Sequence, residues 1–247
     1  MKKRILLLGV FLFAGMVAGH EALAKEVKMA VGFSVAPYII QDADNGIELD
    51  IMREALAYKG HTLKTLYIPF IEIDKAFVDK KVDAIATVEE KIGIDGFFSD
   101  HVITYRNYAI SLAKNNLKIN SIADLGDKSV AAFQLATKYL GSEYAEMAKN
   151  NPRYREKEER TVQIKLLYDG RMDAVVIDKN IFQYYKNMIA DKTDVTQPVV
   201  YHDIFPENKY KVVFQDKAIR DDFNEGLKRL RKTGRYEAIF KEYIKSE

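Results

Sequence analysis

The sequence predicts an α/β fold built as two similar lobes, and three observations lead to this prediction. Short apolar strands alternate with amphipathic helices, the pattern of a largely parallel sheet covered by helices. The stretch Asp79–Ile85 is echoed 90 residues later by Asp169–Val175, each a helix end, a turn and the start of a strand. The polar stretch Asn115–Asp127 lies between them and is typical of a crossing from one lobe to the other.

The first half of the chain predicts the order β-α-β-α-β. Pro37 ends the first strand because proline directs the chain into a turn or an extended loop. After the turn Asn45-Gly46, apolar residues recur at helical spacing up to Gly60, which suits the residue just after a helix end. The predicted elements are a strand at 26–33, a helix from Ile47, a strand at 62–69, a short helix at 71–77 and a strand at 82–87.

The middle of the chain is more polar. Residues 88–99 contain two glycines and read as a loop, and residues 105–114 read as a strand. Within the polar crossing, residues 122–125 predict one short helical piece. We therefore expect residues 115–127 to cross between the two lobes.

The second half begins with Ser129–Gly141, which reads as a buried strand to Gln134 and then a helix opened by Thr137. A strand that turns at once into a helix leaves the first helical N–H groups without partners, and such groups can receive a carboxylate or phosphate. The alternative is an ordinary junction in which the Thr137 hydroxyl only caps its own helix.

The remaining elements continue the α/β alternation. Residues 150–159 are highly charged, contain Pro152 and predict a surface connection. The predicted elements are helices at 137–149, 161–168 and 180–188, strands at 172–178, 197–201 and 209–215, and helices at 218–232 and 235–245. The last helix is amphipathic and is expected to pack on the core.

The N-terminus predicts a secretory signal peptide over residues 1–24. Lys2, Lys3 and Arg4 form a basic start, an apolar run follows, and Ala22-Leu23-Ala24 is a small-x-small cleavage site before Lys25. No later stretch approaches the length of a membrane span. Because the chain has no cysteine, it can form no disulfide and carries no cysteine for a lipid anchor. We therefore expect an exported, soluble periplasmic protein.

Charge and histidine content exclude several classes of function. The predicted signal peptide holds three of the 38 basic and one of the 36 acidic residues. The rest of the chain therefore has equal numbers of basic and acidic residues, and they are interspersed. This argues against a nucleic-acid-binding protein. His61, His101 and His202 include no close pair, so no metal site is expected. We predict no cofactor and a monomer.

From Val27 to its end the chain resembles the bacterial extracellular solute-binding proteins of the polar amino-acid type (family 3). Each motif is weak alone, and their order and spacing carry the resemblance. They are Ala36-Pro37-Tyr38, Gly46–Ile51, Val82–Ile85, Phe98-Ser99-Asp100, Asp124–Val130, Ala136-Thr137, Gly170–Ala174 followed by Asp178, and Gly226-Leu227 with Gly234, Tyr236 and Ile239.

The resemblance implies a periplasmic-binding-protein-like fold of type II, in which two strands cross between the lobes. Lobe 1 would comprise residues 25–111 and 209–247, and lobe 2 residues 112–208. The lobes would close like a hinge on a small ligand in the cleft between them. The partners would be a small-molecule ligand and an inner-membrane permease of an ABC transporter or a sensor receptor.

The resemblance also assigns site residues by position. Phe70 would pack on the ligand from lobe 1, or else belong to the core. Ala136 and Thr137, with the polar Gln134 just before them, would receive the ligand's carboxylate. Asp178, at the carboxyl end of its strand, would pair with the ligand's ammonium group. The alternative for Asp178 is a cap on the helix that follows.

One segment departs from the family pattern. Relatives carry a Thr-x-x-x-Arg-like segment after the third strand, whose arginine grips the ligand's carboxylate through two hydrogen bonds. Here the segment is shorter and runs from Thr87 to Lys91, which would supply a charge without the fork geometry. Glu89 or Glu90 is an alternative cleft-facing group, and Arg106, the nearest arginine, lies in a strand not used this way. Whether a free α-amino acid binds is left open.

Three functions are compatible with the sequence. The first is a periplasmic solute-binding protein that captures an amino acid, or a related amine or organic acid, for a transporter. The second is a dehydratase-like enzyme on the same fold, with Glu89 or Glu90 as the acid or base. The third is a sensory module that acts without a transporter. We expect the first of these and no catalysis.

Overall fold

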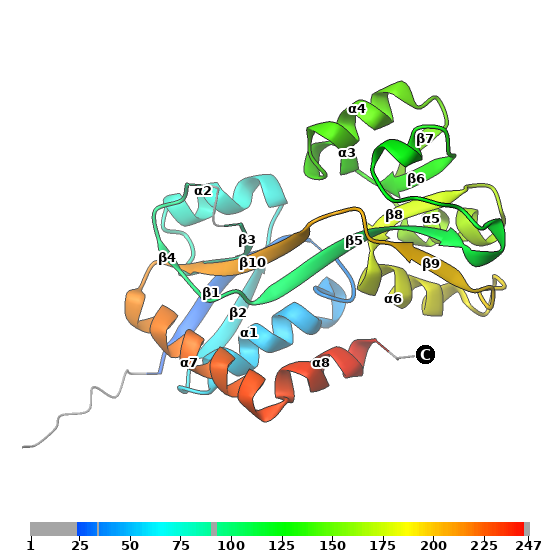
Figure 1. Cartoon of the computed structure of the whole chain (residues 1–247). Coiled ribbons are helices and arrows are strands. Elements are labelled where there is room, and N and C mark those ends of the chain that lie inside the picture. Colours follow the sequence, from blue (N-terminus) through cyan, green and yellow to red (C-terminus); the bar gives the residue numbers. More distant parts are fainter. Residues whose placement is uncertain (1–23, 34, 90–92, 245–247) are drawn as a thin grey trace, which may run out of the picture.

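A computed structural model describes residues 24–33, 35–89 and 93–244 of the chain. It has two α/β lobes lying side by side (Figure 1), which confirms the predicted fold class. Residues 1–23 of the predicted signal peptide, and the predicted site residue Lys91 with its neighbour Glu90, lie outside the described residues. No helix in the described part is both long and apolar enough to cross a membrane.

Lobe 1 is built on a sheet that is covered on both faces. Its strands are β1 (Glu26–Val31), β2 (Thr62–Tyr67), β3 (Ala84–Val88), β4 (Phe97–Phe98) and part of β10 (Glu207–Phe214). Strand β1 pairs in parallel with β2 and β3, whereas β10 runs antiparallel to β3 and β4. Helix α2 (Ile73–Val78) lies on one face, and α1 (Ile47–Ala57), α7 (Lys217–Thr233) and α8 (Arg235–Tyr243) lie on the other (Figure 1).

The two faces of this sheet hold separate apolar cores. Phe77 of α2 belongs to the smaller core, while the residues of α1 and α7 belong to the larger one. Helices α1 and α7 approach closely at Gly226, where a Cβ atom would lie 2.0 Å from the Ala55 carbonyl oxygen. This contact between backbones holds α1 closely against α7.

Lobe 2 repeats the plan. Its strands are β6 (Val130–Phe133), β7 (Tyr154–Lys157), β8 (Ala174–Asp178) and β9 (Val199–His202), and β6 pairs in parallel with β7 and β8. The helices are α3 (Ala136–Tyr139), α4 (Ser142–Asn150), α5 (Arg160–Tyr168) and α6 (Lys179–Ile189). Across both lobes the described residues also include short 3₁₀ segments: η1 (Gln41–Ala43), η2 (Phe70–Glu72), η4 (Ala113–Asn115) and η5 (Ala123–Leu125).

The sequence echo corresponds to one structural device used in both lobes. The Asp83 carboxylate accepts the backbone N–H of Lys28 at 2.9 Å, and the Asp173 carboxylate accepts that of Ser129 at 2.7 Å. Each aspartate precedes the strand that pairs in parallel with the first strand of its lobe. The repeated Asp-Ala pair therefore sets the register of that parallel pair in each lobe.

Two long strands connect the lobes. Residues 103–106 of β5 (Ile103–Leu112) pair with the first half of β10, and residues 107–112 pair with β8 and β9 of lobe 2. The second half of β10 returns to β3 and β4 in lobe 1. Because both strands run through both lobes, the lobe limits drawn from the sequence at 111/112 and 208/209 stay predictions.

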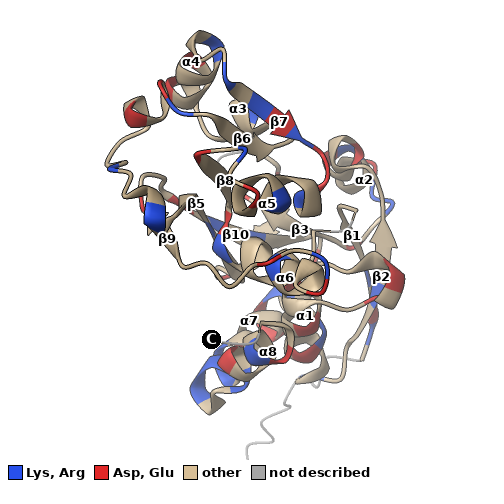
Figure 2. Ribbon diagram, turned by 90° about the vertical axis from the view of Figure 1, so that its right-hand side faces the viewer, with Lys and Arg blue, Asp and Glu red and all other residues tan. Residues whose placement is uncertain are grey.

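Basic residues (Lys, Arg) and acidic residues (Asp, Glu) are interspersed over both lobes (Figure 2).

The structure corrects three predictions of local structure. The expected helix 137–149 is two helices, α3 and α4, separated at Gly141, where φ is +90°. The expected surface connection 150–159 contains strand β7, and the expected loop 88–99 contains the short strand β4. Strand β7 reads YREK and has no apolar alternation, so only its pairing with β6 makes it a strand.

Candidate functional site

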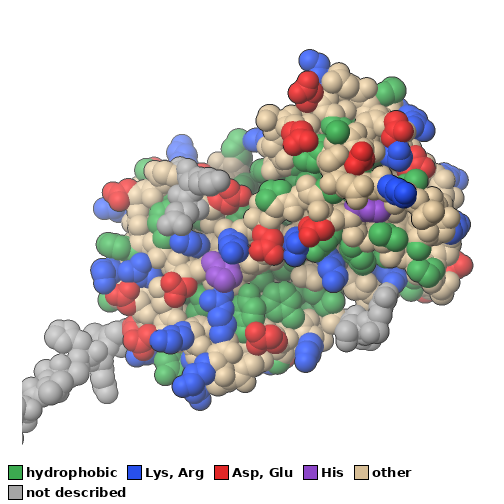
Figure 3. Space-filling view, viewed as in Figure 1, with side chains coloured by type: hydrophobic (Ala, Val, Ile, Leu, Met, Phe, Trp, Pro, Cys, Tyr) green, Lys and Arg blue, Asp and Glu red, His purple; other side chains and the backbone are tan. Residues whose placement is uncertain are grey.

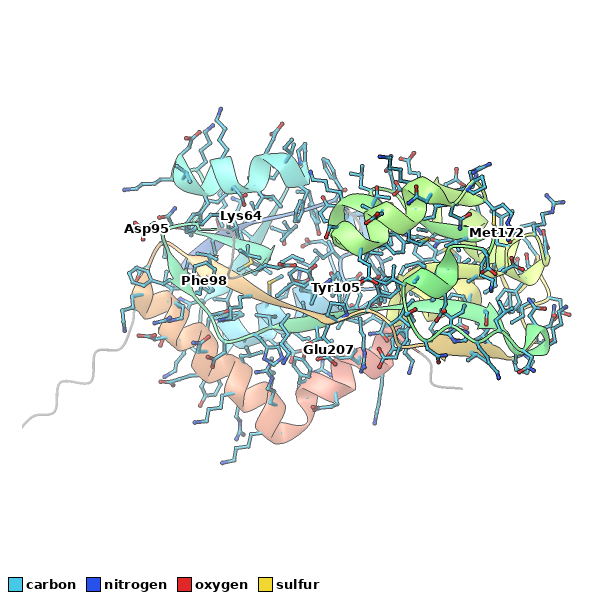
Figure 4. All side chains as sticks on the ribbon, turned by 45° about the horizontal axis from the view of Figure 1, so that its top comes forward. Lys64, Asp95, Phe98, Tyr105, Met172 and Glu207 are labelled. Atoms are coloured by element: carbon cyan, nitrogen blue, oxygen red, sulfur yellow. The ribbon has the colours of Figure 1, made fainter. Side chains whose placement is uncertain are left out.

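A cavity of about 350 Å³ lies between the lobes. The crossing strands supply part of its lining, and Figure 4 places Tyr105 of β5 at the middle of the molecule, between the lobes. The lining residues are Gly32, Phe33, Val35, Ile39, Phe70 and Thr87 of lobe 1, Tyr105, Asn107, Asn208 and Tyr210 of the crossing strands, and Phe133, Tyr139, Leu140, Arg160, Ile177, Asp178 and Ile181 of lobe 2.

Aromatic side chains on both lobes are left unusually exposed at this cavity. Phe33 and Phe70 of lobe 1 are 49% and 54% exposed, and Tyr139 of lobe 2 is 51% exposed. Hydrophobic side chains gather where the lobes meet (Figure 3). Large apolar groups left in water on two facing surfaces indicate a surface that a ligand or a second surface covers.

Glu48, in the first turn of α1, is a fully buried carboxylate beside the cavity. Its two oxygens accept hydrogen bonds from the Thr87 hydroxyl at 2.8 Å and the Tyr105 hydroxyl at 3.0 Å, both from residues that line the cavity. Burial raises its pKa to about 7, although these two hydrogen bonds act in the opposite direction. Thr87 holds its position with φ at +59°, a strained conformation for a β-branched residue.

Asp178 caps helix α6 and joins it to lobe 1. Its Oδ1 accepts the backbone N–H groups of Asn180 and Ile181 and the hydroxyl of Tyr38, and its Oδ2 accepts the backbone N–H of Arg106 at 2.8 Å. Burial raises the pKa of Asp178, and these donors act against that rise. The structure therefore shows the helix-cap alternative for this residue, and its pairing with a ligand's ammonium group stays a prediction.

The turn at Thr137 is already occupied by a carboxylate of the chain itself. Glu156 of β7 accepts the N–H of Leu135 at 2.7 Å and both the N–H and the hydroxyl of Thr137 at 3.0 Å, together with the Tyr154 hydroxyl. Burial alone would raise the pKa of Glu156, but these donors lower it overall. Donors therefore converge here on an anion that is a side chain of the protein itself, and contact of this turn with a ligand's carboxylate stays a prediction.

The residues around this turn correct the sequence prediction in detail. Helix α3 begins at Ala136, and Leu135, with φ at +64°, takes the cap position that Thr137 was expected to fill. Gln134 is exposed and Ala136 is fully buried, and neither of them nor Thr137 lines the cavity. The sequence could not place Glu156 here because β7 was taken for a connection.

Among the described residues that line the cavity, Arg160 is the single basic one. It was not found from the sequence, where it stands at the end of a charged stretch. The sequence offered one sign of its role. An arginine at the first position of a helix lies near the positive end of the helix dipole, where a cation is unfavourable.

Of the other candidate residues, some line the cavity and some do not. Phe70 and Thr87 line the cavity, and their predicted contacts with a ligand stay predictions. Glu89 is exposed and outside the lining. Arg106 does not line the cavity, and its side chain forms ion pairs with Asp203 and Glu207.

Comparisons with known proteins place the fold in the class of two-lobed ligand-binding proteins. The GluR0 ligand-binding core in complex with L-glutamate matches with a TM-score of 0.66 at 18% identity, covering 90% of this chain and 99% of that one. The ancestral cationic amino acid solute-binding protein AncCDT-1 matches at 0.68 and 20%, covering 91% and 97%. AncCDT-1 is also represented by a second solved structure, in which it is named as a precursor of cyclohexadienyl dehydratase.

A histidine kinase sensor domain with similarity to periplasmic binding proteins also matches, with a TM-score of 0.64 at 20% identity, covering 89% of this chain and 96% of that one. No family model and no curated protein matched the sequence. At these identities the comparisons establish the architecture alone. The chain has the two-lobed fold of periplasmic amino-acid-binding proteins.

Proposed function

We propose that this chain is a periplasmic solute-binding protein that captures a small amphipathic solute between its lobes and presents it to an ABC-type transporter. The observation that carries the proposal is the cavity of about 350 Å³ whose walls, on both lobes, hold half-exposed aromatic side chains. A cavity of this size is at the lower end of the roughly 300–1,000 Å³ of small-molecule sites.

Closure of the lobes gives these aromatic side chains a function. A solute that contacts Phe70 on one lobe and Tyr139 on the other has more contacts in the closed state than in the open one. This difference in contact is what shifts the population toward closure. Such a device needs a connection that bends, and the two crossing strands β5 and β10 supply it.

Two neighbouring functions remain as alternatives. The similarity to a histidine kinase sensor domain supports a role in sensing, in which the closed lobes act on a receptor. An enzyme would need an acid or base in the cavity. Glu48, with a pKa of about 7, is the carboxyl group best suited to that chemistry at neutral pH, but it is fully buried behind Thr87 and Tyr105. We therefore favour binding without catalysis.

The proposal is tested by thermal-shift and calorimetric screening of residues 25–247 against amino acids, amines and organic acids. We expect saturable binding of at least one solute and a smaller radius of gyration in solution scattering when it is bound. Phe70→Ala and Tyr139→Ala should each weaken binding. Val78→Ala is the matched control, because Val78 is an exposed apolar residue of α2 outside the cavity. A panel without any binder would contradict the proposal.

Transport and sensing are separated by the partner. Capture of an inner-membrane permease by the solute-bound protein, and not by the free protein, would support transport. Capture of a receptor instead would support sensing, and conversion of the bound solute that is lost in Glu48→Gln would support an enzyme.

A further inference from the structure

Arg160 is held in a fixed orientation at the wall of the cavity. Its Nη1 donates to the backbone carbonyl oxygens of Lys157 at 3.2 Å and Glu158 at 3.1 Å, and its guanidinium group lies 5.7 Å from the ring centre of Phe133. Phe133 also lines the cavity. These contacts use one edge of the guanidinium group and leave its other donors for a further partner.

No carboxylate of the described residues balances this charge. Arg53, Arg106 and Arg235 each form ion pairs with aspartate or glutamate, whereas the structure records none for Arg160 within the described part of the chain. Burial lowers the pKa of Arg160, and its place as the first residue of α5 adds the unfavourable end of the helix dipole. A partly desolvated cation in this position is stabilised by an anion from outside the protein.

The groups that would recognise an ammonium are already used. Asp178 is the only carboxylate among the described residues that line the cavity, and its two oxygens accept four hydrogen bonds from the protein. Three of these donors meet Oδ1 and one meets Oδ2, and the residue is only 3% exposed, so little of this carboxylate is left for a ligand. Glu48 is fully buried, and both of its oxygens also have donors.

Given the proposed function, on which this step rests, we propose that the ligand is a small organic acid with an apolar or aromatic body and no ammonium group. Its carboxylate is received by the free edge of the Arg160 guanidinium group, and its apolar body lies against Phe70 and Tyr139. The Thr137 turn takes no part, because Glu156 already fills it. The binding mode expected from the family resemblance, with an ammonium on Asp178 and a carboxylate on Thr137, would compete at both ends with hydrogen bonds that the chain already makes.

Three probes that share a phenyl ring and differ in charge test this assignment: 3-phenylpropanoate, phenylalanine and 2-phenylethylamine. Calorimetry on residues 25–247 should give the tightest binding for 3-phenylpropanoate, at least about tenfold weaker binding for phenylalanine and the weakest binding for the amine. Arg160→Gln should weaken the binding of 3-phenylpropanoate about ten- to hundredfold, the effect of losing a charge-assisted hydrogen bond. Arg160→Lys should restore part of this loss, because it keeps the charge without the fork.

Arg155→Gln is the matched control. Arg155 is an exposed arginine of the neighbouring strand β7 that, like Arg160, donates to backbone carbonyl oxygens, but it does not line the cavity. Its substitution should leave the affinity unchanged, and circular dichroism should show that all three variants are folded.

The outcomes separate this inference from the proposed function. If phenylalanine or the amine binds more tightly than the acid, or if the acid binds equally well to Arg160→Gln, the ligand class is wrong and the solute-binding function stands. If none of the three probes binds while another solute of the broad panel does, the ligand class is also wrong. If nothing binds at all, the proposed function itself fails.

Discussion

The hydroxyl of Tyr38, in lobe 1, donates a hydrogen bond of 3.0 Å to the carboxylate of Asp178, in lobe 2. The same hydroxyl accepts the side-chain amide of Asn180 at 2.9 Å, and the ring of Tyr38 stacks on Tyr105 with 4.0 Å between the ring centres. Both Tyr38 and Asp178 are buried. One side chain thus connects the first loop of lobe 1, the crossing strand β5 and the start of helix α6.

Tyr38→Phe should lower the free energy of unfolding by about 1–2 kcal/mol, because Asp178 loses a donor and Asn180 loses an acceptor in a buried site. The measurement is urea denaturation at neutral pH. Tyr184→Phe is the control, because the Tyr184 hydroxyl has no hydrogen bond to a described residue and its ring only meets that of Tyr185. Equal stability of Tyr38→Phe and wild type would show that the connection contributes nothing.

Glu48 should make stability depend on pH in a defined direction. Its pKa is raised from 4.5 to about 7, so between these values the folded chain holds a proton that the unfolded chain releases. The free energy of unfolding should therefore fall as the pH rises from about 4.5 to about 7. Glu48→Gln should remove this part of the slope and be more stable than wild type at pH 8 by up to about 3 kcal/mol.

Denaturation curves at several pH values check this prediction. Asp178 also has a raised pKa and acts in the same direction, but it is present in both proteins and cancels in their difference. Glu146→Gln, at an exposed position of α4, should follow the wild-type curve. A Glu48→Gln curve parallel to wild type over the whole range would sink the prediction.

Thr87 combines backbone strain with a needed hydroxyl. Thr87→Val keeps the β-branched side chain at φ +59° but removes the donor to Glu48, and it should cost about 1–3 kcal/mol. Thr87→Ser keeps the donor and lessens the crowding at this backbone conformation, so it should be at least as stable as wild type. Thermal and chemical denaturation measure both, and a Thr87→Val variant at least as stable as Thr87→Ser would show that neither the hydrogen bond nor the relief of strain matters here.

The internal contact at Thr137 changes what its mutation should do. From the family resemblance, Thr137→Val is expected to weaken ligand binding. With its hydroxyl bonded to Glu156, we expect unchanged ligand affinity and a loss of about 1 kcal/mol in stability. Calorimetry and urea denaturation of the same variant distinguish the two, since a weakened affinity at unchanged stability would restore the turn as a ligand site.

Glu156→Gln gives an independent check through pH. The pKa of Glu156 is lowered in the folded chain, so its contribution is present above its ordinary value of 4.5 and is lost as the pH falls through the lowered value. The variant should be less stable than wild type at pH 7 and equal to it at the acidic end. A difference that persists unchanged in acid would contradict this assignment.

Much of the fold could be predicted because the core strands carry the period of their structure. Strand β8 is a continuous buried run and α7 places Phe223, Leu227 and Leu230 on one buried face, and both were predicted within a few residues. Strand β7 escaped because its charged residues follow no apolar period, and the break between α3 and α4 escaped because one glycine carries the only sign of it. In both cases tertiary contacts override local propensity.

Part of the cavity lining was predictable, and its chemistry less so. Phe70, Thr87 and Asp178 were singled out by position and lie along the cavity. Glu48, Glu156 and Arg160 were not, because a charged residue in a sequence shows no sign of the groups that will meet it.

By itself, the sequence determined the alternation of strands and helices, the two-lobed plan and the turn whose donors face a carboxylate, because these depend on neighbours in the chain and on apolar periodicity. Only the tertiary structure decided which charges are satisfied within the protein. Glu156 meets Thr137 because two strands pair, and Tyr38 meets Asp178 across 140 residues because two lobes touch. Arg160 stays without a carboxylate partner among the described residues at the wall of the cavity, because hydrogen bonds and ion pairs depend on distance in space and not along the chain.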